Sequence, residues 1–152
     1  KYENLIMAAL FQFENYPNQL VLELESFPSE ESIWKVPAGI ANSPGNLALH
    51  ITGNLNHFIG AVLGKTGYIR ERELEFSRKD VPRAVLIAGL RDAQALVVGI
   101  LVDLDGNKKL ADYPDSFKGR TLSIDDALSH LLAHLAYHTG QVNYLRRILY
   151  SA

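Results

Sequence analysis

Residues 123–149 read SIDDALSHLLAHLAYHTGQVNYLRRIL, and this stretch decides the fold. Apolar residues recur in it every three or four positions, which is the period of an amphipathic α-helix. Ser123 is a suitable N-cap residue, and Asp125 and Asp126 place negative charge in the first turn, where it favours the helix dipole. The stretch therefore predicts a helix from Ser123 to about Leu149. The apolar stripe that would face a core consists of Leu128, Leu131, Leu132, Leu135, Val142, Leu145 and Leu149.

Three more stretches have helical periodicity. They run from about Tyr2 to Ser26, from Pro44 to Leu63, and from near Asp80 to Asp105-Gly106. Ser43 precedes the second of them, where a serine hydroxyl can cap free backbone N–H groups and the following proline suits the first helical position. No segment alternates like a strand and no internal repeat is present. The sequence therefore predicts an all-α fold, a four-helix bundle with long connecting loops.

Two of the connecting loops are rich in polar and charged residues. The loop from Lys65 to Lys79 contains Arg70-Glu71-Arg72-Glu73, where the signs of charge alternate, and we expect it to be solvated. An arginine that faces a bound anion is the alternative interpretation. The segment from Asn107 to Leu122 is expected to be a polar loop.

The composition limits the kinds of protein and of site. The chain has 152 residues, which predicts a single domain over residues 1–152. Its 15 Lys plus Arg and 17 Asp plus Glu form no basic stripe, so we expect no nucleic-acid partner. The chain contains no Cys, so any metal must be held by nitrogen or oxygen. The longest apolar run, residues 95–102, is shorter than the ~20 residues of a bilayer span, so we expect no membrane association and take the cytoplasm as the default location.

Histidine is the residue type in this sequence with the clearest chemical pattern. The chain contains His50, His57, His130, His134 and His138. Three of them lie four positions apart on the last predicted helix, and histidines at i and i+4 can reach one ion. His134 and His138 face inward at the edge of the apolar stripe, while His130 faces outward and is expected to be solvated. His130 and His138 are about 12 Å apart along the helix axis, too far for a single ion to bind all three.

A third ligand should come from another helix. His50 and His57 both flank the apolar stripe of the second predicted helix, about two turns apart, and periodicity alone does not choose between them. Asn46 and Asn54 lie one turn before and after His50, and their amides could orient an imidazole or a bound water. Ordinary hydrogen-bonded structural histidines are the alternative interpretation.

Three segments resemble a known family. The segment from His134 to Arg147, HLAYHTGQVNYLRR, resembles the last-helix motif of the DinB-like superfamily, which includes the YfiT-related helical bundles. Residues 42–54, NSPGNLALHITGN, resemble the second-helix motif of that superfamily, and residues 70–76, RERELEF, resemble a segment of one of its branches. The resemblance covers essentially the whole chain.

The resemblance implies an up-down-down-up four-helix bundle that forms a homodimer and binds a divalent ion through three histidines. Matched residue by residue, these ligands are His50, His134 and His138. Thr139 stands where a basic residue often follows the last ligand. Asn54 and Gln141 are the candidates for residues that orient the ligands.

The expected function follows from that ligand set. Three neutral imidazoles leave coordination positions open, as in catalytic rather than structural sites. The resemblance implies zinc or nickel, with iron or manganese as alternatives, and a reaction that transfers a low-molecular-weight thiol such as bacillithiol, mycothiol or glutathione to a small electrophile. A hydrolase that uses metal-bound water, or a catalytically silent dimeric metal-binding or stress-response module, are the alternatives. No general base is evident, because Tyr137 projects away from the seam.

Overall fold

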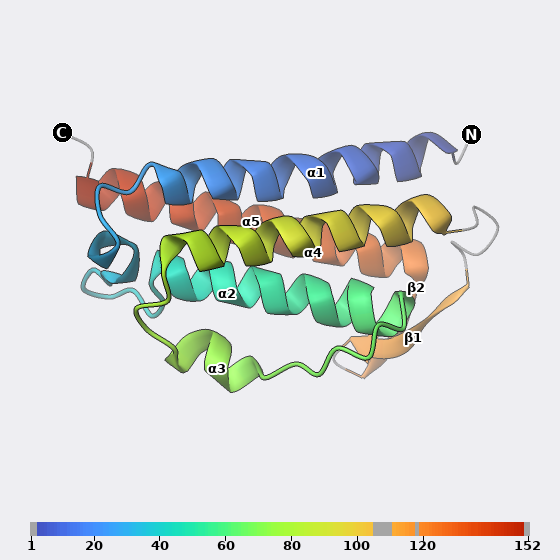
Figure 1. Cartoon of the computed structure of the whole chain (residues 1–152). Helices are drawn as coiled ribbons and strands as arrows, with labels where there is room; N and C mark the ends of the chain where they lie inside the picture. The colour runs from blue at the N-terminus through green and yellow to red at the C-terminus, as the bar shows by residue number, and fades with distance from the viewer. Residues whose placement is uncertain (1–2, 105–110, 118, 151–152) are drawn as a thin grey trace.

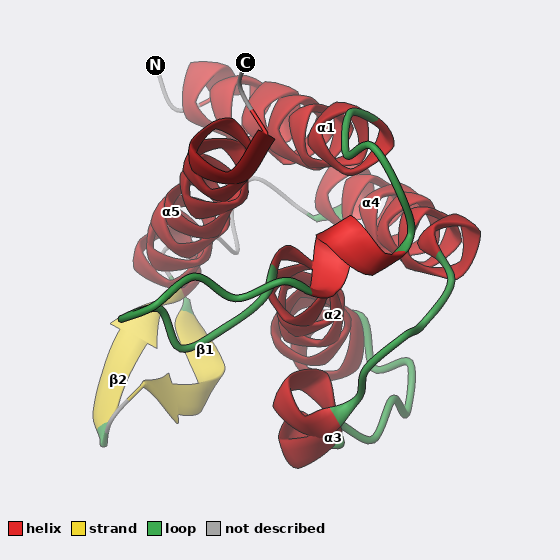
Figure 2. Ribbon diagram, turned by 90° about the vertical axis from the view of Figure 1, so that its left-hand side faces the viewer, coloured by secondary structure: helices red, strands yellow, loops and turns green. Residues whose placement is uncertain are grey.

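Four long helices make up most of the computed structural model, which describes residues 3–104, 111–117 and 119–150. They are α1 (Glu3–Glu25), α2 (Pro44–Leu55) with its continuation η2 (Asn56–Leu63), α4 (Arg83–Asp103) and α5 (Ile124–Tyr150). Figure 1 shows them side by side along one direction, and in Figure 2 they surround a common interior. The predicted all-α class is confirmed. The predicted helix start at Tyr2 and the predicted helix end at Asp105-Gly106 lie outside the described residues.

Both predicted N-caps are present. The Ser43 hydroxyl accepts the Asn46 N–H at 3.1 Å, and Pro44 occupies the first turn of α2. The Ser123 hydroxyl accepts the Asp126 N–H at 3.1 Å at the start of α5. These local signals fix where the two helices that carry His50, His134 and His138 begin.

The core lies between the four long helices. Its buried leucine, isoleucine and valine side chains come from every one of them, and each contributes about 1.5–3 kcal/mol of burial free energy. They include Leu20 and Leu24 of α1, Leu47 and Ile51 of α2, Leu90 and Val97 of α4, and Leu131, Leu135 and Val142 of α5. The predicted apolar stripe of the last helix thus faces the core.

The second helix differs from the prediction in its last two turns. Residues Asn56–Leu63 form a π-helix, and its end is marked by a hydrogen bond from the Gly64 N–H to the Ile59 carbonyl at 2.9 Å, five residues back. Apolar periodicity does not distinguish this wider turn from an α-helix. The predicted bounds of this helix, Pro44 and Leu63, are therefore confirmed, but its second part is π-helical.

A β-hairpin replaces most of the polar loop expected from Asn107 to Leu122. Strands β1 (Asp112–Phe117) and β2 (Arg120–Ser123) pair antiparallel, with an irregular register between their ends. Tyr113 is 2% exposed and its hydroxyl donates to the Phe58 carbonyl at 2.6 Å, while the Phe117 ring stacks on the Phe58 ring. Only one side chain of β1 is buried, so the sequence shows no alternation that would predict a strand. Residues 107–110 and 118 of that segment lie outside the described residues.

The loop from Lys65 to Lys79 contains a short helix, α3 (Arg72–Ser77). Figure 1 shows it lying below α2. Its Glu75 side chain is buried against α2, although most of the segment is exposed. The prediction of a solvated loop is therefore wrong at Glu75.

One described helix, α4, is long and apolar enough to cross a membrane when judged by length and composition alone. Core helices of soluble proteins also meet this criterion. In the structure α4 packs along α1 and α2 as part of the helical core. The uninterrupted apolar run of residues 95–102 is shorter than the apolar part of this helix.

Candidate metal centre

Three imidazole rings meet between α2 and α5. They belong to His50, His134 and His138, and one ring nitrogen from each lies within 4.8 Å of the others. The His134 Nε2 atom is 3.1 Å from the Nε2 atoms of both His50 and His138. His50 comes from α2, whereas the other two lie one turn apart on α5. The structure thus brings together the three histidines matched by the family motifs.

A buried carboxylate orients His50. His50 Nδ1 donates to the Glu75 carboxylate at 2.8 Å, and Arg70 donates to its two oxygens at 2.7 and 2.8 Å. Burial raises the pKa of Glu75, but the hydrogen bonds from His50 and Arg70 outweigh burial and hold that pKa below its usual range. An ionised carboxylate only accepts hydrogen bonds, so the proton of a neutral His50 lies on Nδ1. The Nε2 lone pair of His50 therefore faces the other two histidines.

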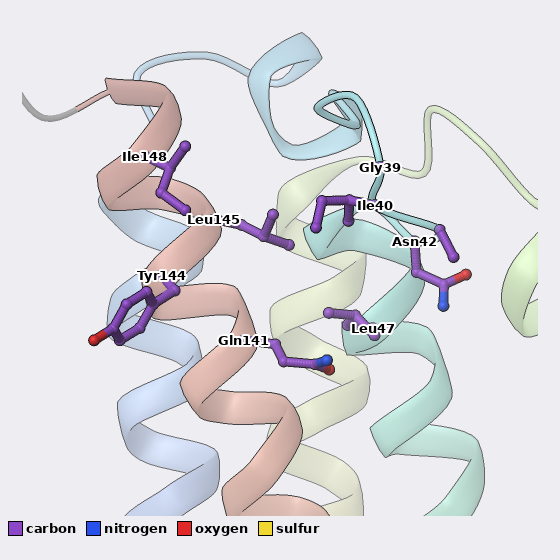
Figure 3. A pocket seen from close by; sticks show the side chains of 9 residues that line it. Gly39, Ile40, Asn42, Leu47, Gln141, Tyr144, Leu145 and Ile148 are labelled. Atoms are coloured by element: carbon purple, nitrogen blue, oxygen red, sulfur yellow. The ribbon is translucent and has the colours of Figure 1, made fainter.

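A side-chain amide orients His138 in the same way. His138 Nδ1 donates to Gln141 Oε1 at 2.7 Å, which directs the Nε2 lone pair of the neutral ring toward His134. Figure 3 shows Gln141 projecting from α5 toward α2. Burial lowers the pKa of His138, and the hydrogen bond to Gln141 only partly opposes this effect. The predicted orienting role of Gln141 agrees with this contact.

His134 lies between the other two rings. Burial, together with the neighbouring His138 and His50, lowers the pKa of His134 to about 3. The ring is therefore neutral at physiological pH and can act as a ligand. Its Nδ1 atom is buried and has no hydrogen-bond partner among the described residues.

The three rings fit a divalent ion. The Nε2 lone pairs of His50 and His138 both face His134, and a single proton on His134 Nε2 could satisfy only one of them, whereas a cation can accept all three lone pairs. Nitrogen ligands at about 2.0–2.1 Å from an ion lie about 2.8–3.4 Å from one another when they are adjacent in octahedral or tetrahedral geometry. The two Nε2 separations of 3.1 Å fall within that range. The group is therefore compatible with a metal site.

Asn46 and Gly53 place Glu75 beside His50. The Asn46 amide donates to the carbonyls of Glu75 and Arg78 at 3.0 and 2.9 Å, which fastens α3 to the start of α2. Gly53 lets the Glu75 side chain approach, because a Cβ atom at that position would overlap the carboxylate. The expectation that Asn46 orients an imidazole directly is wrong, because its amide binds the backbone of the segment that carries Glu75.

The other predicted residues lie around the three rings. His57 is in the π-helix, outside the three-histidine group, and packs against Phe58. His130 is exposed, as expected, one turn before His134 on α5. Asn54 is buried one turn after His50, and its side chain has no hydrogen bond to another described residue. Tyr137 is exposed, in agreement with its expected direction away from the seam.

A cavity of about 530 Å³ opens onto two of the three histidines. Its base includes the buried residues His50, Asn54 and Leu131, and its mouth is formed by exposed polar and basic residues. Its lining consists of His50, Asn54, Phe58, Arg70, Arg72, Ser116, Phe117, Arg120, Leu122, His130, Leu131 and His134. A small molecule in this cavity would reach the histidine cluster.

Sequence reasoning missed Arg70 and Glu75 as site residues. Arg70 begins the run of alternating charge and Glu75 lies two positions after its end, and such a charged segment is typical of a solvated loop. The only available signal was that this run resembles a segment of one branch of the superfamily. Their role depends on contacts with His50, which is 20 and 25 positions away in the sequence.

Comparisons with known proteins agree with this fold. Residues 3–152 match the family described as "Protein of unknown function (DUF1572)", which is DinB-like. A solved structure of a DinB-like protein from Bacillus cereus ATCC 10987 is similar over 98% of this chain and 95% of that chain, with a TM-score of 0.69 and 18% sequence identity. At that identity the likeness concerns the fold alone. No curated protein matches the sequence.

Proposed function

We propose that this chain, which belongs to the DinB-like family DUF1572, is a divalent-metal-dependent enzyme. The ligands in this proposal are His50, His134 and His138. The observation that carries it is the convergence of their Nε2 atoms, two of them with lone pairs fixed by hydrogen bonds at Nδ1. Such carboxylate and amide partners are typical of metal-binding histidines.

The proposed reaction is the transfer of a low-molecular-weight thiol, of the bacillithiol, mycothiol or glutathione type, to a small electrophile. An ion such as zinc or nickel, or alternatively iron or manganese, would supply a Lewis acid that lowers the pKa of the thiol. The thiol proton is lost to solvent, and the sulfur forms a bond to the electrophilic carbon. The bond from that carbon to its leaving group breaks with the electrons going to the leaving group, or, in an epoxide, the C–O bond breaks and the oxygen takes a proton from solvent. The protein itself contains no Cys, so it has no thiol of its own to compete for the ion or the electrophile.

Metal analysis of protein purified without a histidine tag tests the site. We expect about one ion per chain, and loss of that ion in each of the variants His50→Ala, His134→Ala and His138→Ala. His57→Ala and His130→Ala are the matched controls and should keep the ion. Metal content that changes in neither His134→Ala nor His138→Ala would contradict the proposal.

A turnover screen tests the reaction class. Thiols of the three types are offered with a chloroaromatic or epoxide electrophile to the metal-loaded protein, and ester or amide hydrolysis is assayed in parallel. Metal-dependent consumption of thiol favours the transferase, and metal-dependent hydrolysis without thiol favours the hydrolase. Bound metal with neither activity favours the silent dimeric module.

The proposal also includes the architecture and setting implied by the resemblance. In Figure 1 α1 and α5 run in one direction and α2 and α4 in the other, which supports an up-down-down-up four-helix bundle. We further propose a homodimer in the cytoplasm that acts on small molecules, without a nucleic-acid or membrane partner.

A further inference from the structure

The cavity beside the histidine cluster carries an unbalanced charge. Arg70, Arg72 and Arg120 line it, and no Asp or Glu side chain belongs to its described lining. The chain as a whole has a net charge of −2, so this cluster is not a consequence of a basic composition. The cavity therefore has a local positive potential in an otherwise slightly acidic molecule.

The three arginines differ in whether their charge is paired with a carboxylate. Arg70 is bound to Glu75 through two hydrogen bonds, so its charge is already paired. Arg72 and Arg120 are exposed, and neither forms an ion pair with another described residue. The Arg72 guanidinium lies over the Phe76 ring, 5.2 Å from its centroid, a contact that leaves the N–H groups at its edge free to donate. Two guanidinium groups at the mouth of the cavity are thus available to an anion.

Apolar side chains also line the cavity. Phe58 and Phe117 stack with their centroids 5.1 Å apart, and the His130 ring meets Phe117 edge-on. Leu122 and Leu131 complete this apolar lining. A ligand that fills the cavity would therefore place a hydrocarbon or aromatic part against the two phenylalanines.

We infer that the cavity takes an amphipathic small molecule whose carboxylate or comparable oxyanion binds Arg72 and Arg120. The apolar part of the molecule lies against Phe58 and Phe117, and its other end reaches the histidine cluster. Guanidinium groups bind planar carboxylates through paired charge-assisted hydrogen bonds. The role of the end at the histidines rests on the proposed function, whereas the anion site rests on the arginines.

Binding of four matched probes to the zinc-loaded protein tests this inference. The probes are hexanoate, 1-hexanol, 6-mercaptohexanoate and 6-mercaptohexanol, and their dissociation constants are measured by ligand-observed NMR titration. We expect each carboxylate to bind about tenfold more tightly than its alcohol, because charge-assisted hydrogen bonds exceed neutral ones. Raising the salt concentration should weaken the carboxylates and leave the alcohols nearly unchanged.

Variants locate the anion site. Arg72→Gln and Arg120→Gln should each reduce the preference for carboxylate over alcohol about threefold, and the double variant should abolish it. Arg91→Gln, at an exposed position on α4 and outside the cavity lining, is the matched control and should keep the full preference. Circular dichroism checks that the variants are folded. Equal binding of carboxylate and alcohol by the wild type, or an undiminished preference in the double variant, would overturn the inference.

The same titrations separate this inference from the proposed function. Hexanoate and hexanol carry no thiol, and their difference measured in the metal-free protein reports the arginines without carboxylate coordination to zinc, while the effect of zinc on 6-mercaptohexanol reports the thiol chemistry. A carboxylate preference without any zinc effect supports the anion site and contradicts the thiol transferase. If 6-mercaptohexanoate binds more tightly than both hexanoate and 6-mercaptohexanol, the anion belongs to the thiol. If hexanoate and 6-mercaptohexanol bind to the same protein molecule at the same time, the carboxylate that the arginines bind is part of the electrophile.

Discussion

Glu75 is held by three hydrogen bonds in a place where a carboxylate is costly to bury. One comes from His50 and two from Arg70, and together they keep Glu75 ionised despite its 7% exposure. The same contacts fix the tautomer of His50 and the direction of its Nε2 lone pair. The orientation of one proposed ligand therefore depends on a residue that never touches the ion.

Glu75→Gln should weaken metal binding without removing any proposed ligand. The amide keeps the shape of the side chain but loses the charge that pairs with Arg70 and polarises His50. We expect the metal dissociation constant to rise about 10- to 100-fold, as for other partners of ligating histidines. Competition with a chromogenic chelator measures it. Glu73→Gln, an exposed position on the same short helix, is the control, and equal affinities of the two variants would contradict the prediction.

The pKa of His134 predicts a pH dependence of the metal-free protein. Its value of about 3 in the folded chain lies below the 6.5 of an unfolded histidine, so the unfolded state binds more protons between these values. The stability that a neutral His134 contributes is present above pH 6.5 and is lost as pH falls toward 3. At pH 5 the loss relative to pH 8 is at most about 2 kcal/mol.

Urea unfolding of metal-free wild type and His134→Gln measures this loss. The wild-type free energy of unfolding should fall more steeply between pH 8 and pH 5 than that of the variant. His57→Gln serves as the control and should follow the wild type. Parallel pH curves for wild type and His134→Gln would show that the buried imidazole titrates normally.

At the scale of residues, the sequence predicted the histidines but not their partners. His134 and His138 are recognisable because their spacing of four places them on one side of a helix whose apolar stripe is visible. The choice of His50 over His57 came from the family motif, since periodicity left it open. Glu75 could not be found in this way, because its burial results from packing against Gly53 rather than from any pattern around it.

At the scale of elements, the close approach of α3 to α2 at Glu75 requires that Gly53 has no side chain. The Glu75 carboxylate occupies the space that a Cβ atom would need, and its three hydrogen bonds prevent it from moving freely aside. Gly53→Ala should therefore destabilise the protein by about 1–3 kcal/mol and weaken metal binding at the same time.

Gly99→Ala is the matched control for this prediction. Gly99 is an exposed helical position on α4, and a Cβ atom there would meet no described atom within 4 Å. Alanine should stabilise the helix by about 0.5–1 kcal/mol and leave the metal affinity unchanged. Melting temperatures and metal titrations of both variants decide the matter. If the Gly53→Ala variant is as stable as Gly99→Ala and binds metal as tightly, the close packing of α3 against α2 is refuted.

The elements that sequence patterns missed are those stabilised by distant contacts. The α-helices follow from local periodicity and from caps such as Ser43. The hairpin depends on the Tyr113 hydroxyl reaching a carbonyl 55 positions away, at Phe58. The π-helix that carries Phe58 has the same apolar pattern as an α-helix, so neither its wider turns nor the anchoring point for Tyr113 could be foreseen.

At the scale of the whole molecule, one face of α5 exposes large apolar side chains. Tyr137, Tyr144 and Ile148 are each more than 60% exposed and are spaced seven and four positions apart, so they share a side of the helix. Tyr144 and Ile148 also line the groove in Figure 3, which Ile40 borders from the loop before α2. This surface is where we expect the proposed homodimer to form.

Ile148→Glu should convert that dimer to a monomer, because a carboxylate cannot be buried at an apolar interface without a partner. Size-exclusion chromatography with light scattering measures the mass over a range of concentrations. Val85→Glu, at an exposed apolar position on α4, is the control and should leave the dimer intact. A dimer that is lost in Val85→Glu and kept in Ile148→Glu would move the interface to α4.

The nitrogens that meet at the candidate centre come from positions 84 residues apart, His50 and His134. While an ion is bound to both, α2 and α5 cannot separate at this point without breaking a coordination bond. Local openings that detach one of these helices would then cost the binding free energy of the ion, while the fraying of helix ends remote from the centre would not. Amide hydrogen exchange should therefore slow on α2 and α5 together when the ion binds, so that two helices far apart in the chain become one cooperative unit.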